Sequence, residues 1–163
     1  MPVFFTSDTH FGDHRVLNIG RRPFGSVAEM DAALVEGWNT TVGADDEVWH
    51  LGDVARTTAA AADLLPRLNG RKRLLIGNND PAGVVALPHW LEATHYAELT
   101  LGGRRVVLCH YPFRSWNGMG RGAVNLHGHS HGRLKPVPRQ FDVGVDARAW
   151  RPVSLEALVG PAG

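Results

Sequence analysis

Residues 47–53 read EVWHLGD, an apolar run that ends in a glycine and a carboxylate. A short run that is rich in β-branched and aromatic residues and stops at Gly, Asn or Asp predicts a buried strand. We therefore expect a strand at residues 47–51 that places Asp53 just beyond its carboxyl end. The same pattern predicts five further strands, at residues 3–7, 72–76, 104–109, 123–126 and 141–145.

A helical pattern lies between the first two predicted strands. In residues 26–42 the apolar positions recur on one helical face, and they are Val27, Met30, Leu34 and Trp38. Ser26 and Glu29 form a capping-box pattern at the start of this helix. A second helix is predicted at residues 58–65, and paired glycines at 102–103 predict a hairpin. The alternation of strand and helix, followed by strand and loop, is typical of a mixed α/β fold.

Length and composition limit the class of protein. With 163 residues, 44% of them hydrophobic, we expect one domain over residues 1–163. The formal net charge of +1 gives no clear basic tract, so no nucleic-acid surface is expected. Cys109 is the lone cysteine, which excludes an internal disulfide and a thiolate metal cage. No signal-like or membrane-spanning run is present, so we expect a cytoplasmic protein without a membrane partner; the oligomeric state stays open.

Metal-ligand side chains follow five of the predicted strands. In chain order they are Asp8 and His10, Asp53, Asn78, His110, and His129 with His131. Open α/β sheets place ligand sites beyond the carboxyl ends of their strands. Residues two apart in an extended segment point the same way, so each Asp-x-His or His-x-His pair is expected to converge.

This donor set predicts a dinuclear metal site. Seven donors are too many for one tetrahedral zinc, but they suit two ions ~3.5–4 Å apart that share a carboxylate. Nitrogen and oxygen ligands without thiolate favour transition metals over calcium or magnesium alone. We expect two divalent ions, with manganese first and iron, zinc, nickel or cobalt as alternatives.

The ordered motifs resemble the calcineurin-like metallophosphoesterase family, in particular its small bacterial and phage members. The family pattern is Asp-x-His, Gly-Asp, Gly-Asn-His followed by an acid, then His, then Gly-His-x-His, and the resemblance covers nearly the whole chain. Residues 49–54 (WHLGDV), 110–112 (HYP) and 143–146 (VGVD) resemble such members as well. The resemblance implies a four-layer αββα sandwich of two mixed β-sheets flanked by helices.

The resemblance also implies a role for each ligand. One metal would be held by Asp8, His10, Asp53 and His131, and the other by Asp53, Asn78, His110 and His129. Asp53 would bridge the two ions. The family hydrolyses phosphate esters directly, by attack of a metal-bridging hydroxide on phosphorus. The metals make that hydroxide available at neutral pH because they lower the pKa of bound water towards ~7.

Asn79 departs from the family pattern, because a histidine usually follows Gly-Asn. That histidine is thought to protonate the leaving oxygen, a contribution of ~10²–10⁴ in rate, and an amide cannot replace it. We therefore expect a phosphodiesterase, or a hydrolase of activated esters, rather than a phosphomonoesterase, acting on a small phosphate-ester substrate. A catalytically weak or inactive metal-binding scaffold of the same fold is one alternative. A nuclease is another, which ranks lower without a basic tract.

Four further residues are candidates for substrate chemistry. His127 and His14 are possible substitutes for the missing acid, although His127 also fits a strand histidine that faces away from the metals. Arg56 and Arg114 follow the Gly-Asp and His-Tyr-Pro motifs, and a guanidinium fork suits phosphate. The alternative for both is a solvated loop arginine. Ranked below them for phosphate binding are Arg21, Arg22, Arg121 and Arg133.

Overall fold

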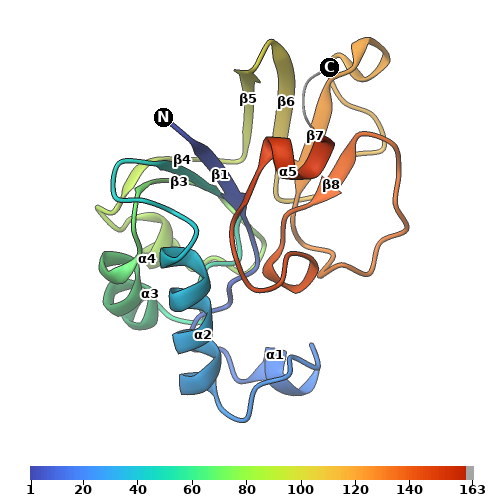
Figure 1. Ribbon diagram of the computed structural model, residues 1–163. Helices are drawn as coiled ribbons and strands as arrows, with labels where there is room; N and C mark the ends of the chain where they lie inside the picture. The colour runs from blue at the N-terminus through green and yellow to red at the C-terminus, as the bar shows by residue number, and fades with distance from the viewer. Residues whose placement is uncertain (161–163) are drawn as a thin grey trace.

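Two β-sheets face each other in the computed structural model, which describes residues 1–160 (Figure 1). The first sheet has the order β4-β3-β2-β1-β9, with β1 Val3–Thr6, β2 Glu47–His50, β3 Arg71–Leu75, β4 Trp90–Thr94 and β9 Val153–Ser154. The second has the order β5-β6-β7-β8, with β5 Tyr96–Leu101, β6 Arg104–Cys109, β7 Val124–His127 and β8 Gln140–Asp142. Only β9 and β5 run antiparallel to their neighbours, so both sheets are mixed.

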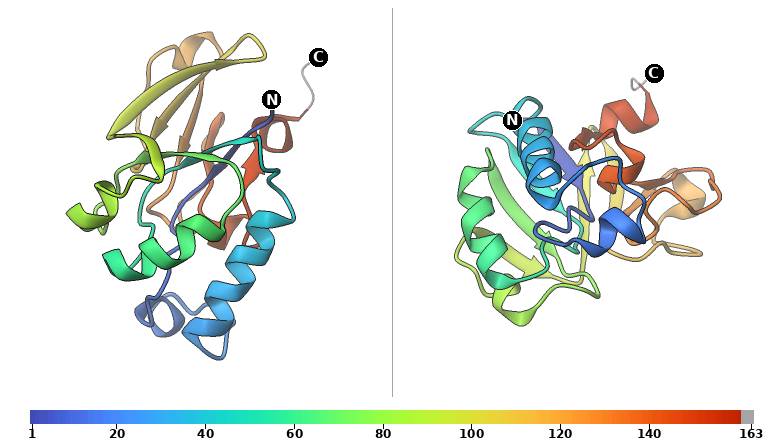
Figure 2. Two further views of the ribbon diagram at one scale, coloured as in Figure 1. Left: turned by 90° about the vertical axis from the view of Figure 1, so that its left-hand side faces the viewer. Right: turned by 90° about the horizontal axis from the view of Figure 1, so that it is seen from below.

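Helices cover the face of the first sheet that is turned away from the second sheet (Figure 2). They are α2 Val27–Asn39, α3 Thr58–Leu64, which continues into a 3₁₀ turn at Leu65–Arg67, and α4 Ala82–Val85. The predicted cap of α2 is present, because the Ser26 side chain accepts the backbone N–H of Glu29. The Glu29 carboxylate accepts the backbone N–H of Gly25, whereas a capping box would use that of Ser26. Met30, Leu34 and Trp38 form the buried face of α2.

The second sheet has a thinner cover. Its outer face packs against residues 113–123, whose only regular element is a 3₁₀ turn at Met119–Arg121, and Trp116 is buried there. Helix α5, Leu155–Val159, contacts β1 and β9, and Leu155 enters the core between the sheets. Helix α1, Arg15–Asn18, lies in the loop after β1. The predicted sandwich of two mixed sheets with flanking helices is confirmed. Within residues 1–160, no helix is both long and apolar enough to cross a membrane.

Parallel pairing brings the loops that carry the predicted ligands to one end of the sandwich. Strands β1, β2 and β3 run the same way, as do β6, β7 and β8. Beyond the strands, Asp8 N donates to Gly52 O at 2.9 Å, and Gly128 N donates to His110 O at 2.9 Å. A bridge between Ser7 and Gly144 joins the two sheets at this end. The loops after β1, β2, β6, β7 and β8 therefore meet.

Candidate metal centre

Two buried carboxylates stand in the middle of the predicted ligand set. His10 Nε2 lies 4.0 Å from Asp8 Oδ1 and 3.5 Å from Asp53 Oδ2. His110 Nε2 lies 3.7 Å from Asp53 Oδ2, and His131 Nε2 lies 3.8 Å from Asp8 Oδ1. These separations exceed hydrogen-bond lengths and fit donors that share a cation, since ligands about 2.0–2.2 Å from an ion lie about 3–4 Å apart. The Asp53 carboxylate is therefore within reach of both His10 and His110.

Asn78 gathers the remaining ligands beside this group. Its Oδ1 lies 2.9 Å from His110 Nε2 and 3.1 Å from His129 Nδ1. The rings of His110 and His129 have centroids 5.2 Å apart. All seven residues predicted as ligands thus lie around one site, in two adjacent clusters, and their coordination of metal stays a prediction.

The backbone that carries the ligands is not extended, which corrects the reason given for their convergence. Positive φ angles occur at Asp8 (57°), His10 (49°), Asp53 (58°), His129 (66°) and His131 (49°). The side chains of His129 and His131 diverge, because His129 approaches Asn78 whereas His131 approaches Asp8, but those of Asp8 and His10 converge as predicted. Left-handed conformations at non-glycine residues are costly and persist where the surroundings impose them, as at functional sites.

Two glycines allow the ligand loops to approach each other. A Cβ at Gly52 would lie 2.7 Å from His110 Nδ1, and Gly52 also has a φ of +98°. A Cβ at Gly128 would overlap the Ser7 side chain, 1.9 Å from its Oγ. Close packing around the predicted ligands therefore requires both glycines, and at Gly52 the turn geometry requires one as well.

Two of the predicted ligands have buried polar atoms without partners, which is the clearest indication of a cation site. Asp8 Oδ1 and His10 Nε2 are buried and accept or donate no hydrogen bond. Burial, together with the charge of Asp53, raises the pKa of Asp8 to about 8. Burial lowers the pKa of His10 to about 4, so its ring is neutral with a lone pair to offer. A divalent cation would offset both desolvation penalties, so the residues present fit the predicted ions.

A buried ion pair between Arg22 and Asp146 orients the ring of His131 through its Nδ1. His131 Nδ1 lies 2.8 Å from Asp146 Oδ2, and this hydrogen bond raises the pKa of His131. Asp146 also accepts from Arg22 Nε at 3.0 Å and Nη2 at 2.9 Å. Arg22 is buried and donates to the backbone oxygens of Asp8 and Thr9. Ranking Arg22 with the solvated loop arginines therefore missed its role, because sequence spacing does not reveal a contact across 124 residues.

Asp80 fixes the loop after β2 to the loop after β3. Its Oδ2 accepts Asp53 N at 2.9 Å and Gly77 N at 2.7 Å, and its Oδ1 accepts Val54 N at 2.8 Å. Three backbone donors on one carboxylate hold the Asp53 backbone in place. Asn79 donates two hydrogen bonds to the Asp53 side chain. Burial raises the pKa of Asp53, but these hydrogen bonds and the nearby histidines lower it more, so the pKa lies below its usual range.

A cavity of about 280 Å³ opens beside the first ligand cluster. Asn79, His10 and His131 line it together with Arg15, Ile19 and Arg133. Arg15, which the sequence did not single out, binds Asp13 through Nη2 at 2.7 Å. Arg56 and Arg114 are exposed and do not line this cavity, and their contacts with substrate phosphate stay predictions.

Neither candidate for a substitute acid lines that cavity. His127 is buried, with Nδ1 2.7 Å from Gly128 O, and it lines a separate cavity with Asp142 and Arg148. His14 is exposed at the start of α1. A role for either residue in proton transfer stays a prediction.

Comparison with known proteins identifies close relatives among bacteriophage proteins. The chain is 34% identical to the gene 66 protein of Mycobacterium phage D29, over 89% of this chain and 88% of that protein. It is 30% identical to the gene 66 protein of Mycobacterium phage L5, over 89% and 86%. An uncharacterized protein of Methanocaldococcus jannaschii is 29% identical, over 96% and 89%. No protein-family model matches the chain.

Solved structures share the fold. A protein of unknown function from Aquifex aeolicus superposes with a TM-score of 0.80 at 20% identity, over 96% of this chain and 97% of that one. The phosphoesterase YfcE of E. coli gives 0.56 at 18%, over 88% and 78%. An archaeal phosphodiesterase gives 0.51 at 19%, over 88% and 82%. At these identities the likeness establishes the shared fold alone.

Proposed function

We propose that this chain, which belongs to the same family as the gene 66 proteins of mycobacteriophages L5 and D29, is a metal-dependent phosphoesterase. It would hydrolyse phosphodiester or activated phosphate ester bonds, as a small member of the calcineurin-like metallophosphoesterases. The observation that carries this proposal is the pair of buried, unpartnered ligand atoms, Asp8 Oδ1 and His10 Nε2, beside the Asp53 carboxylate. Solved phosphoesterases of the same fold support it.

The residues divide into two metal-binding groups that share Asp53. Asp8, His10, Asp53 and His131 would hold one ion, and Asp53, Asn78, His110 and His129 the other. When bound, two divalent ions, manganese foremost, would lower the pKa of water and stabilise charge on phosphoryl oxygens. The Arg22–Asp146 pair fixes the ring of His131, and Asp80 fixes the Asp53 backbone. Hydrogen bonds of this kind fix the orientation of a ligand and tune its affinity for the metal.

Asn79 determines the kind of ester that fits. Its amide lies at the cavity and carries no proton that it can transfer to a leaving alkoxide. Hydrolysis would then depend on a leaving group that departs without protonation, as an activated ester supplies. This favours diesters and activated esters over monoesters of simple alcohols.

Asn79 also supports a second candidate, a metal-binding scaffold of the same fold. Its Nδ2 donates to Asp53 Oδ2, so this side chain holds a proposed ligand and supplies no acid. A scaffold would bind the ions and hydrolyse nothing.

Hydrolysis of bis-p-nitrophenyl phosphate tests the proposal. We expect the metal-stripped chain to be inactive and to gain activity with Mn²⁺. We expect Asp53→Asn to abolish that activity, whereas Asp63→Asn, which changes an exposed carboxylate on α3, should leave it unchanged. Metal binding without turnover in the presence of Mn²⁺, Fe²⁺, Zn²⁺, Ni²⁺ or Co²⁺ would favour the scaffold instead.

A further inference from the structure

The near-neutral net charge conceals a strong separation of charge along the chain. Residues 99–141 contain seven of the 17 basic residues and none of the 16 acidic ones. The rest of the chain carries ten basic and 16 acidic residues. Charge asymmetry between parts of a chain indicates a polyanionic partner. The basic part includes β6, β7 and the loops that carry His110, His129 and His131.

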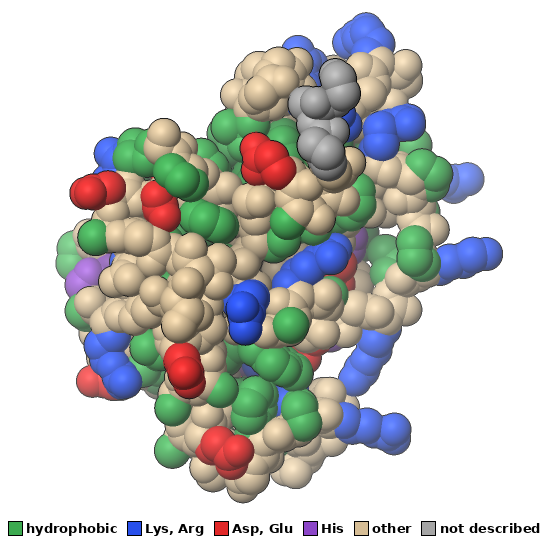
Figure 3. Space-filling model, in the orientation of Figure 1, with side chains coloured by type: hydrophobic (Ala, Val, Ile, Leu, Met, Phe, Trp, Pro, Cys, Tyr) green, Lys and Arg blue, Asp and Glu red, His purple; other side chains and the backbone are tan. Residues whose placement is uncertain are grey.

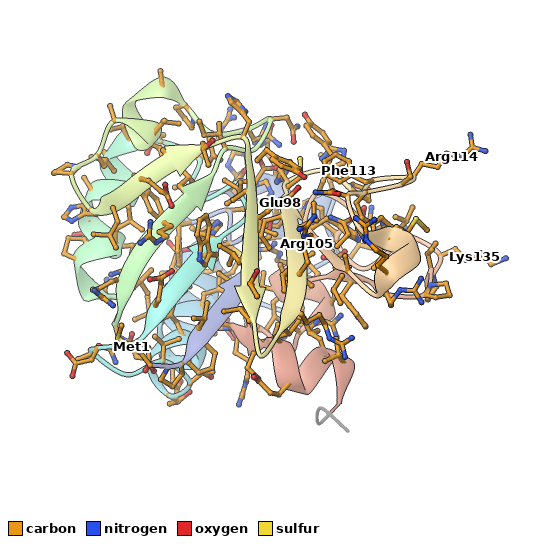
Figure 4. All side chains as sticks on the ribbon, turned by 90° about the horizontal axis from the view of Figure 1, so that it is seen from above. Met1, Glu98, Arg105, Phe113, Arg114 and Lys135 are labelled. Carbon is orange, nitrogen blue, oxygen red and sulfur yellow. The ribbon has the colours of Figure 1, made fainter. Side chains whose placement is uncertain are left out.

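Five of these basic side chains are exposed, and we call them together the basic surface: Arg114, Arg121, Arg133, Lys135 and Arg139. Lys and Arg side chains project along the right-hand outline of the molecule in Figure 3. Figure 4 shows Arg114 and Lys135 extending from the same side of the protein. Among residues 1–160, none of the five forms an ion pair with a carboxylate.

Hydrogen bonds tie together the loops that carry the basic surface. Arg139 Nη2 donates to Met119 O at 3.0 Å, beside Arg121. The side chain of Gln140 donates to the backbone oxygen of Phe113, the neighbour of Arg114. These contacts hold the loop that carries Arg114 and Arg121 beside Arg139.

The basic surface reaches the proposed metal centre through Arg133, and an exposed tyrosine lies at the same centre. Arg133 lines the cavity that also contains His10 and His131. Tyr111 is 45% exposed, and its ring centroid lies 4.8 Å from that of His129. An exposed aromatic ring beside a positively charged surface is the combination that binds single-stranded nucleic acid, because bases stack on the ring while the phosphates meet the charges.

We propose that the substrate is single-stranded nucleic acid, bound along the basic surface with a phosphodiester at the metal centre and a base against Tyr111. This inference rests on the proposed function. In the reaction a water oxygen bonds to phosphorus as the bond from phosphorus to one sugar oxygen breaks. One product ends in a phosphate, and the other ends in a hydroxyl that takes up a proton from water. The expectation of a small substrate is thereby replaced by that of a polymer.

Binding is measured by the fluorescence anisotropy of a labelled single-stranded oligonucleotide of mixed sequence, with EDTA present so that no cleavage occurs. We expect the logarithm of the association constant to fall with the logarithm of salt concentration with a slope of about −2 to −3.5, since each neutralised phosphate contributes about −0.7. The triple variant Arg121→Gln, Lys135→Gln, Arg139→Gln should bind at least about tenfold more weakly and reduce the slope by about 2.

A matched variant removes the same charge elsewhere. Arg67→Gln, Arg71→Gln, Arg151→Gln changes three exposed arginines outside the basic surface and should bind like the wild type. Tyr111→Ala should weaken binding about fivefold or more, because stacking on one ring contributes about 1–3 kcal/mol, and Tyr111→Phe should not. Equal losses in the two triple variants would overturn the proposal. So would equally tight binding of a duplex, or equally effective competition by polyglutamate.

Cleavage distinguishes this inference from the proposed function. With Mn²⁺, we expect the wild type to cut the oligonucleotide and to hydrolyse bis-p-nitrophenyl phosphate. Hydrolysis of the small diester without any cutting of the oligonucleotide would overturn the inference and leave the proposed function standing. Hydrolysis of neither compound would contradict the proposed function, and with it the assignment of nucleic acid as substrate.

Discussion

Asn79 donates two hydrogen bonds to the carboxylate of Asp53, from its backbone N to Oδ1 and from its side-chain Nδ2 to Oδ2, each at 2.8 Å. The side chain at this position is thus directed at a proposed ligand. It also lines the cavity in which a leaving group would lie. The chain therefore has an amide where the calcineurin-like metallophosphoesterases that its motifs resemble usually have a histidine, and this amide positions Asp53.

Hydrolysis should accordingly depend steeply on the leaving group. We expect the rate constants for a series of aryl phosphodiesters to fall strongly as the pKa of the leaving phenol rises. Asn79→His, which supplies a group able to protonate the leaving oxygen, should raise the rate for the poorest leaving groups at least about tenfold relative to Asn79→Ala. Equal rates for the two variants across the series would show that this position does not reach the leaving oxygen.

Asp146 should control metal affinity without touching the metal. Asp146→Asn keeps the size of the side chain but removes the charge that holds His131 and Arg22. Such changes behind a ligand weaken metal binding by about 10–100-fold. Competition of the metal-stripped protein with a fluorescent chelator measures this affinity, and Asp63→Asn is the control. An unchanged Mn²⁺ affinity in Asp146→Asn would remove His131 from the ligand set.

Metal binding should release a proton at neutral pH. Burial raises the pKa of Asp8 to about 8, so in the metal-free protein this carboxyl is protonated at pH 7, and a metal ligand must be ionised. Through Asp8, the Mn²⁺ affinity should rise about tenfold per pH unit below about pH 8. Above that pH, this contribution of Asp8 should level off. Calorimetric titrations in two buffers of different protonation enthalpy measure the released protons. A titration at pH 6.5 without proton release would contradict this account.

His50 should make the fold sensitive to acid. Its ring centroid lies 6.4 Å from those of Trp38 and Trp90, its Nδ1 accepts Gly52 N at 3.1 Å, and burial lowers its pKa to about 3. The unfolded chain binds the proton near pH 6.5 and the folded protein does not, so stability is full above that pH and is lost as pH falls towards 3.

Urea unfolding at pH 7, 6 and 5 measures this loss. We expect His50→Asn, which keeps an acceptor for Gly52 N, to be less stable at pH 7 but to lose less stability on acidification. The slopes of the free energy of unfolding against pH should differ between the two proteins by up to about 1.4 kcal/mol per pH unit, the value for one proton. Parallel pH profiles for the variant and the wild type would exclude His50 as the source.

The central strands and the longest helix could be predicted from the sequence because each buries a periodic apolar pattern. β6, Arg104–Cys109, has the predicted bounds, and α2 begins at its predicted cap. β4, Trp90–Thr94, was not predicted because it is an edge strand with three exposed residues in the middle. The short helices α1, α4 and α5 have four or five residues, too few to show a helical period.

The proposed ligands could be found from sequence because they are fixed by local motifs at strand ends, where the topology brings them together. The left-handed backbone at Asp8, His10 and His131 could not be predicted from the sequence, since only the surrounding loops impose it. Arg22 and Arg15 were also missed, because their roles depend on contacts that neither spacing nor residue type indicates. The basic surface was missed for another reason, which is that a net charge averages over the whole chain.

Anomalous diffraction at the manganese edge, from crystals grown with Mn²⁺, tests the two-metal centre most directly. We predict two peaks about 3.5–4 Å apart on either side of the Asp53 carboxylate. Asp8, His10 and His131 should surround one peak, and Asn78, His110 and His129 the other. A single peak, no peak at this site, or two peaks that Asp53 does not contact would contradict the account.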